Sequence, residues 1–130
     1  MIVLAILVMF VLDAIWICLN KPRYAALVSS VQIKKMRVRI VPTIIAYLAM
    51  VIGLVFIIIP NAKKELKLNG NTAIMVALKC GGLFGFVVYT IYNATNYAIF
   101  DGYLLRIAIM DTLWGTLLFS IVTWVAIFSK

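Results

Sequence analysis

Two short runs near opposite ends of the chain each place an aspartate three residues before a tryptophan, inside an otherwise apolar segment. They are LDAIW, with Asp13 and Trp16, and MDTLW, with Asp111 and Trp114. A charged side chain at the centre of a lipid-embedded helix costs at least ~2.5 kcal/mol on insertion scales, so such residues pair with partners. Each aspartate therefore needs hydrogen-bond donors, and a carboxyl group so placed can bind a polar group or accept a proton.

The composition defines the environment of these residues. Of the 130 residues, 66% are hydrophobic and 12% are charged, and the mean hydropathy is +1.16. Ordinary soluble domains are about half apolar and a quarter charged, so the chain is expected to be an integral membrane protein. Its apolar segments are long and continuous, and a backbone in lipid must satisfy its own hydrogen bonds, so the segments predict helices. The expected fold class is all-α.

Several kinds of chemistry are disfavoured by the residues present. The chain has no histidine, and its cysteines, Cys18 and Cys80, do not have metal-ligand spacing, so we expect no metal and no cofactor. There is no recognisable nucleophile–base pair, which disfavours an enzyme and leaves an activity on lipid open. The net charge of +8 favours contact with anionic lipid head groups over nucleic acid in a chain of this hydropathy.

Four apolar segments predict a four-helix transmembrane bundle in a single integral membrane domain, residues 1–130. Short connections imply antiparallel neighbours, with the N- and C-termini on the same side. The segment 20–39 is basic, and its apolar middle predicts a short helix at the membrane interface. Pro60 is expected to end the second span, ahead of a polar turn over 61–71. The spans are expected at about 2–19, 40–59, 72–92 with a helical extension to about 99, and 103–128.

The basic residues indicate an orientation. The side that holds the 20–39 connection and the start of the fourth span carries more Lys and Arg than the other, so it is expected to be cytoplasmic, with both termini external. The residues compared are Lys21, Arg23, Lys34, Lys35, Arg37, Arg39 and Arg106 against Lys63, Lys64, Lys67 and Lys130. Four of them, Lys34, Lys35, Arg37 and Arg39, are the candidate membrane-surface residues that would contact anionic head groups.

The two aspartates lie at similar depth from that same side. Asp13 lies ~12 Å inward from Lys21 and Asp111 ~7.5 Å inward from Arg106, at 1.5 Å per residue. The third span ends on this side with the run YNATNYA. Polar residues in lipid turn toward the bundle, so we predict one polar cluster near this interface. Its expected members are Asp13, Trp16, Asn93, Thr95, Asn96, Asp111, Trp114 and Gly115.

The third span also carries a packing signal. Gly81 and Gly85 are four residues apart and form a small-xxx-small pair, which permits close approach of another helix. Gly85, Asn93 and Asn96 share a helical face by their three- and four-residue spacing. The packing face and the polar face of this span are therefore expected to coincide.

The ordered set LDAIW, YNATNYA and MDTLWGT resembles the pattern of a family of small membrane proteins catalogued as domain of unknown function 2177. The resemblance covers nearly the whole chain and implies a four-helix membrane protein, without naming an activity. Where the family's pattern has an acidic residue beside its Thr-Asn pair, this chain has Asn93, so it lacks one carboxyl group. The matching positions are Asp13, Trp16, Thr95, Asn96, Asp111, Trp114, Gly115 and Thr116.

Three functions fit these features. The leading hypothesis is that the cluster binds a polar or lipid head group, with Asp13 and Asp111 as hydrogen-bonding or proton-accepting groups. The alternatives are a transporter or proton-coupled permease subunit and a structural component of a larger assembly, such as a viral or cell envelope. The cluster could also serve only to hold the helices together, which direct contact between its side chains would favour. The expected partners are the bilayer and its anionic head groups, with a homo-oligomer or larger membrane assembly left open.

Overall fold

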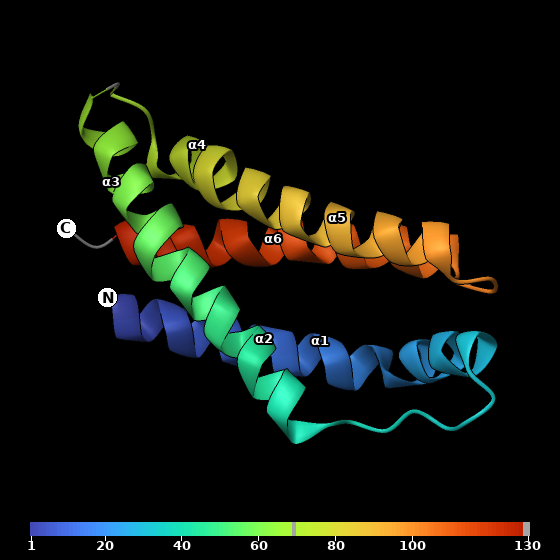
Figure 1. Ribbon diagram of the computed structural model, residues 1–130. Coiled ribbons are helices and arrows are strands. Elements are labelled where there is room, and N and C mark those ends of the chain that lie inside the picture. The colour runs from blue at the N-terminus through green and yellow to red at the C-terminus, as the bar shows by residue number, and fades with distance from the viewer. Residues whose placement is uncertain (69, 129–130) are drawn as a thin grey trace.

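The computed structural model describes residues 1–68 and 70–128, and these residues contain helices and no strand. Four of the helices are long and apolar enough to cross a bilayer, and they follow one another along the chain as in Figure 1. The second and third each include a π-helical stretch. The predicted all-α, four-helix architecture is confirmed. The elements are α1 (Ile2–Val31), α2 (Ile40–Ile52), η1 (Gly53–Ile58), α3 (Ile59–Leu68), α4 (Ala73–Ala77), η2 (Leu78–Gly82), α5 (Leu83–Ile99) and α6 (Leu105–Phe128).

Helix α6 is the centre of the bundle. It is the most buried of the four long helices, and both α1 and α5 pack against it. The start of α1 and the end of α6 lie at the same end of the molecule, and the α2–α3 helix crosses the others at a slant (Figure 1). As a result, α3 lies close to α4, whereas α2 diverges from α5 toward α1.

The third long helix and α6 meet backbone to backbone. A Cβ atom added to Gly81 would overlap the carbonyl oxygen of Phe119, and one added to Gly85 would overlap the carbonyl oxygen of Gly115. Glycine is needed at both positions because no side chain fits between the two helices. Such close approach is how membrane helices gain van der Waals contact, since lipid supplies little hydrophobic driving force between them.

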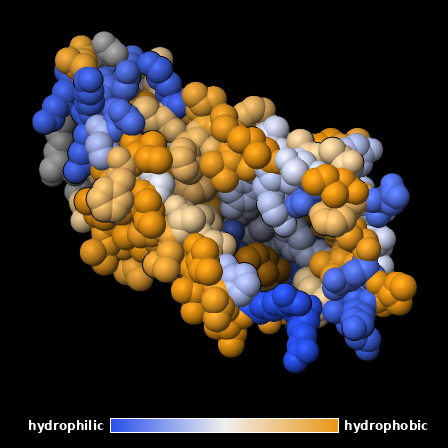
Figure 2. Space-filling model, viewed as in Figure 1, coloured by the Kyte–Doolittle hydropathy of each residue, from blue (hydrophilic) through white to orange (hydrophobic). Residues whose placement is uncertain are grey.

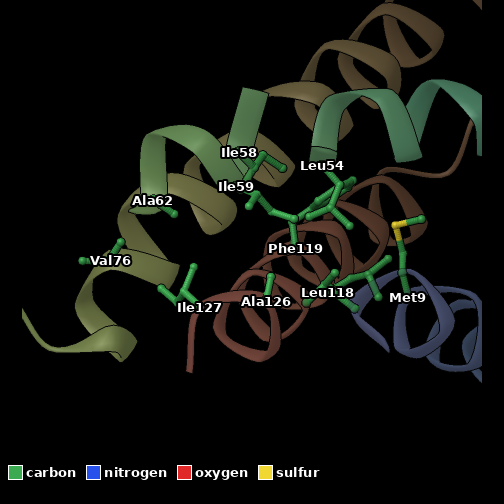
Figure 3. Close-up of a cluster of buried hydrophobic side chains, with 12 residues drawn as sticks. Met9, Leu54, Ile58, Ile59, Ala62, Val76, Leu118, Phe119, Ala126 and Ile127 are labelled. Carbon is green, nitrogen blue, oxygen red and sulfur yellow. The ribbon is translucent and has the colours of Figure 1, made fainter. Parts of the chain in front are cut away.

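The end of the bundle where the chain begins is filled by apolar side chains (Figure 3). They come from the first half of α1, from η1, α3 and α4, and from the second half of α6. This apolar core leaves the opposite end of the bundle to the polar residues. Its members are Ala5, Met9, Leu54, Ile58, Ile59, Ala62, Val76, Leu118, Phe119, Val122, Ala126 and Ile127.

Helix α1 is longer than the sequence pattern indicates. We expected a separate interfacial helix within 20–39, which is wrong: α1 continues through Pro22 to Val31, and only 32–39 is non-helical. The helix persists because contacts on its far side hold it, including Leu27, which is buried, and Ser30, whose Oγ donates to the Gly102 carbonyl at 2.8 Å. At 30 residues, or ~45 Å, α1 exceeds the ~30 Å hydrocarbon layer, so part of it projects beyond.

Pro60 does not end the second long helix, contrary to expectation. The helix continues to Leu68, and the π-helical turn η1 ends at Ile58, two residues before the proline. Proline lacks the N–H of a regular turn and its ring crowds the preceding turn, and widened turns of this kind relieve that conflict. Beyond Pro60, buried Ala62 and the 3.1 Å ion pair between Glu65 and Lys79 hold the helix against the third one.

The fourth long helix begins at Leu105, slightly later than the expected residue 103, and the third runs from Ala73 to Ile99. The turn between them contains Gly102, which has a φ of +83° and lies against the backbone of Ser30. An L side chain rarely adopts this conformation, so glycine suits the turn. Asn69 of the predicted 61–71 turn and Lys130 of the orientation count lie outside the described residues.

Candidate functional site

Asp13 lies on α1 and is almost completely buried, with 7% of its surface exposed. Its Oδ2 accepts a hydrogen bond from the Tyr47 hydroxyl of α2 at 2.6 Å, and its Oδ1 accepts one from Trp114 Nε1 of α6 at 3.2 Å. The carboxyl group therefore links α1 to two other helices. This contact also joins the two Asp-Trp turns, because Trp114 belongs to the second of them.

Asp111 makes the corresponding contacts on α6. Its Oδ1 accepts a hydrogen bond from the Tyr24 hydroxyl of α1 at 2.6 Å, and its Oδ2 accepts one from Asn93 Nδ2 of α5 at 2.8 Å. Tyr24 in turn accepts a hydrogen bond from Trp16 Nε1 at 2.9 Å. Each tryptophan is therefore hydrogen-bonded toward the aspartate of the other turn. Trp114 donates directly to Asp13, and Trp16 donates to Tyr24, which donates to Asp111.

The two tryptophans also contact each other. The rings of Trp16 and Trp114 stack with their centroids 4.5 Å apart and their planes 1° from parallel. Stacking at this distance fixes the rotation of α1 against α6, because each large ring covers the other. The depth and helical phase of the two Asp-Trp turns predicted that they would meet, and in the structure they do.

Asn93 extends the network to the turn between α5 and α6. It is buried, with 2% of its surface exposed, and its amide also donates to the Tyr89 carbonyl at 2.9 Å. The Tyr103 hydroxyl donates to Asn93 Oδ1 at 2.9 Å. A phenol is protonated at neutral pH and can donate, and burial raises the pKa of the Tyr103 phenol further. Gly115 of α6 gives room to the Tyr89 ring, which a Cβ atom there would overlap.

Two of the expected cluster members lie at its edge. Thr95 is exposed on α5, and it is not part of the hydrogen-bonded network among the described residues. Asn96 is half-buried and lines a small surface pocket with Tyr103, Phe100 and Val31, and it is not among the described residues that bond to the aspartates. The four basic residues are exposed in the 32–39 connection: Lys34, Lys35, Arg37 and Arg39.

The main residues that sequence reasoning missed are Tyr24, Tyr47 and Tyr103. Tyr24 was assigned to a connection, although it follows Trp16 and Asn20 at two successive four-residue steps and so shares their helical stripe. That spacing could have placed it. Tyr47 has only the weaker signal of a hydroxyl in an apolar span, and nothing local indicates that it bonds to Asp13. We call the two aspartates, the side chains that bond to them and the further partners of those side chains the polar network: Asp13, Trp16, Tyr24, Tyr47, Tyr89, Asn93, Tyr103, Asp111 and Trp114.

Helices α1 and α2, which carry Asp13 and Tyr47, border a hollow. Figure 2 shows this hollow on one face of the molecule, in the wedge that α2 leaves as it diverges from α5 (compare Figure 1). Its walls are mostly pale, which marks residues of intermediate hydropathy, and hydrophilic atoms border it on the side of the 32–39 connection. Helix α2 has no fully buried residue; Met50 and Val51 near its end pack against the apolar core, and Tyr47 bonds it to Asp13.

The donors to the two aspartates are all neutral. Within residues 1–68 and 70–128, no Lys or Arg forms an ion pair with Asp13 or Asp111. In the same residues, no three His, Cys, Asp or Glu side chains group as metal ligands would. The site is therefore a pair of carboxyl groups surrounded by phenols, indoles and one amide, and its chemistry is that of hydrogen-bond acceptance.

Four long apolar helices with a polar network buried between them define a small multi-pass integral membrane protein. The chain belongs to the family described as predicted membrane protein, domain of unknown function 2177 (DUF2177), whose sequence model matches residues 1–128. The resemblance carried by the two Asp-Trp turns and the YNATNYA run is thereby confirmed. No curated protein and no solved structure matches the chain.

Proposed function

We propose that the polar network binds the polar head group of a membrane lipid that enters from the bilayer through the hollow between α1, α2 and α5. The observation that carries this proposal is that two membrane-embedded aspartates are held by neutral donors alone. Each carboxylate offers about four acceptor sites and uses two. Asp13 and Asp111 therefore retain acceptor capacity for a hydroxyl or ammonium group of a ligand.

The aromatic residues suit the same kind of ligand. The network contains four aromatic rings, those of Trp16, Trp114, Tyr24 and Tyr47. The face of such a ring attracts a cation, and the attraction rises as water is excluded. A head group that ends in an ammonium or in hydroxyl groups would match both the acids and the rings.

A second candidate role is structural, and one observation favours it. Every one of the four carboxylate oxygens of Asp13 and Asp111 accepts a hydrogen bond from a side chain of the protein. The donors come from all four long helices, so the network also ties the bundle together. Each such bond in a membrane protein contributes ~0.6 kcal/mol on average.

The transporter hypothesis has less support. The apolar core of Met9, Leu54, Leu118, Phe119 and their neighbours fills the other end of the bundle with fully buried side chains. A polar solute crossing within one chain would have to pass that core. A site open to one leaflet fits this division into a polar and an apolar end better than a path through the protein does.

The orientation and the partners belong to this proposal as well. We place the exposed 32–39 connection on the cytoplasmic side, where Lys34, Lys35, Arg37 and Arg39 would contact anionic head groups. The polar network then lies toward the cytoplasmic leaflet. Cysteine labelling of this connection in intact and permeabilised cells would test the assignment, since external labelling contradicts it.

Binding can be tested through the tryptophans of the network. In a Trp124→Phe background, fluorescence comes from Trp16 and Trp114 alone. Reconstitution in vesicles whose lipids carry a nitroxide on an ethanolamine, glycerol or choline head group should give stronger quenching with one head group than with the others. Asp13→Asn and Asp111→Asn should each remove that preference while leaving helicity and detergent stability close to the parent.

The outcomes separate the two roles. Selective quenching that disappears in both aspartate variants supports head-group binding. Equal quenching by all three lipids, together with a loss of thermal stability in both variants, supports a purely structural network. Tyr97→Phe, which alters an exposed tyrosine of α5, is the matched control and should change neither measurement.

A further inference from the structure

A second concave site lies on the bundle, and its lining includes neither aspartate. It is a groove of about 320 Å³ between α1 and the start of α6, and both Arg23 and Arg106 line it. The rest of its lining is mainly apolar and includes Ala26, Ile107 and Met110. A groove with two cationic groups and an apolar wall suits an anion that is attached to hydrocarbon.

Arg23 is held in place rather than merely exposed. Its Nη1 donates to Asn20 Oδ1 at 2.5 Å, and the Asn20 amide donates to the Trp16 carbonyl at 3.0 Å. Asn20 is itself buried, with 3% of its surface exposed. A fixed guanidinium loses less conformational freedom when it binds a ligand than a free one does.

Neither arginine has an acidic partner. Within the part of the chain that the structure describes, no carboxylate forms an ion pair with Arg23 or Arg106. Arg106 is the second residue of α6, a helix of 24 residues, so the positive end of the helix dipole lies at the same place. The positive charge of the groove is therefore left for a ligand to neutralise.

The position of the groove indicates the source of the anion. The apolar stretch of α1 is followed by Asn20, Lys21 and Arg23, and the apolar stretch of α6 is preceded by Arg106. The groove between these residues therefore lies at the depth of lipid head groups. We propose that it binds the phosphate of an anionic phospholipid between Arg23 and Arg106, with an acyl chain along the apolar wall. Basic pockets between membrane helices bind phosphate head groups in this way, and guanidinium groups match phosphate geometry.

Among the described residues neither arginine bonds to an aspartate, and the groove meets the polar network where Asn20, which holds Arg23, bonds to the Trp16 backbone carbonyl. Binding there should survive Asp13→Asn, and head-group binding at the aspartates should survive loss of the arginines. The two proposals can therefore fail separately.

Native mass spectrometry of the full chain, in detergent with equal amounts of phosphatidylglycerol and phosphatidylcholine, tests the proposal. The parent protein should retain phosphatidylglycerol preferentially. Arg23→Gln with Arg106→Gln should lower that preference roughly tenfold or more, as expected for the loss of two charges near the membrane surface. The control pair Lys63→Gln with Lys64→Gln removes the same charge from exposed positions of α3, to which no head-group contact is assigned, and should leave the preference unchanged.

Three results would overturn the proposal. One is an equal loss of preference in the lysine control, which would indicate diffuse attraction. Another is an unchanged preference in the arginine pair. The third is displacement of phosphatidylglycerol by millimolar inorganic phosphate, which would identify a soluble anion as the ligand. If circular dichroism shows that the glutamine pair has lost helicity, Arg23→Lys with Arg106→Lys replaces it. That pair keeps the charge and loses the bidentate fork, so a weaker preference is expected and an unchanged one overturns the proposal.

Discussion

The α5–α6 pair and the α1–α2 pair are held together by opposite means. Between α5 and α6, Gly85 lies against the backbone of Gly115, and the contact needs no polar side chain to form. Between α1 and α2, the hydroxyl of Tyr47 bonds to Asp13 and its ring packs on Phe10 with centroids 5.1 Å apart. Close backbone packing makes the first pair rigid, whereas single side chains connect the second.

The two Asp-Trp turns differ in the same way, because one lies at a backbone-packed helix pair and the other at a pair joined by side chains. Asp111 bonds to Asn93 across a helix pair that glycines already hold together, so its hydrogen bond adds little to the architecture. Asp13 bonds to Tyr47 of α2, a helix with no fully buried residue, so its hydrogen bond adds to the partial packing of Met50 and Val51 on the core. The same motif therefore lies on a side of the bundle closed by glycine packing in one case and on a side joined by side-chain contacts in the other.

The largest effect is expected from filling the space between α5 and α6. Gly85→Ala should lower the free energy of unfolding by ~1–3 kcal/mol, because the new Cβ meets a backbone carbonyl that moves only if the helices separate. Gly53→Ala is the matched control, since its Cβ meets the end of the Phe84 ring, which can turn aside. Thermal unfolding in detergent measures both, and equal losses would contradict the difference between the pairs.

A smaller, local effect is expected from removing the attachment of α2. Tyr47→Phe deletes the donor to Asp13 and should cost ~0.6 kcal/mol, and at most about 1.7. Hydrogen exchange should accelerate in residues 40–52 and stay unchanged in α5. Tyr97→Phe, at an exposed position, serves as the control. Faster exchange in α5 as well would show that the network supports the whole bundle equally.

The smallest effect is expected at the edge of the network. Tyr103→Phe removes one hydrogen bond to Asn93 Oδ1, while the Asn93 amide keeps Asp111 and the Tyr89 carbonyl as acceptors. Its cost in unfolding free energy should fall below that of Tyr47→Phe when both are measured in the same detergent. A larger cost for Tyr103→Phe would make the α5–α6 turn, rather than α2, the part that depends on polar contacts.

Local properties of the sequence predicted most of the fold. Hydropathy predicted four membrane helices, and the spacing of the glycines predicted where close packing is feasible, as seen at Gly85. The proline rule failed at Pro60, where a π-helical turn lies close before the ring, and the expected end of the first span near residue 19 failed because tertiary contacts continue α1 through Pro22. Composition and local rules describe each segment alone, so they miss helices that other segments stabilise.

For the candidate site, the sequence by itself determined that two aspartates enter the membrane beside two tryptophans and lie at a common depth. Depth and helical phase follow from the fixed rise and twist of a helix, so they can be counted along the chain. Only the tertiary structure decided that Tyr24 bonds to Asp111, that Tyr47 bonds to Asp13, and that Thr95 stays outside. Those outcomes depend on how the helices rotate and cross, which the packing of all four helices sets together.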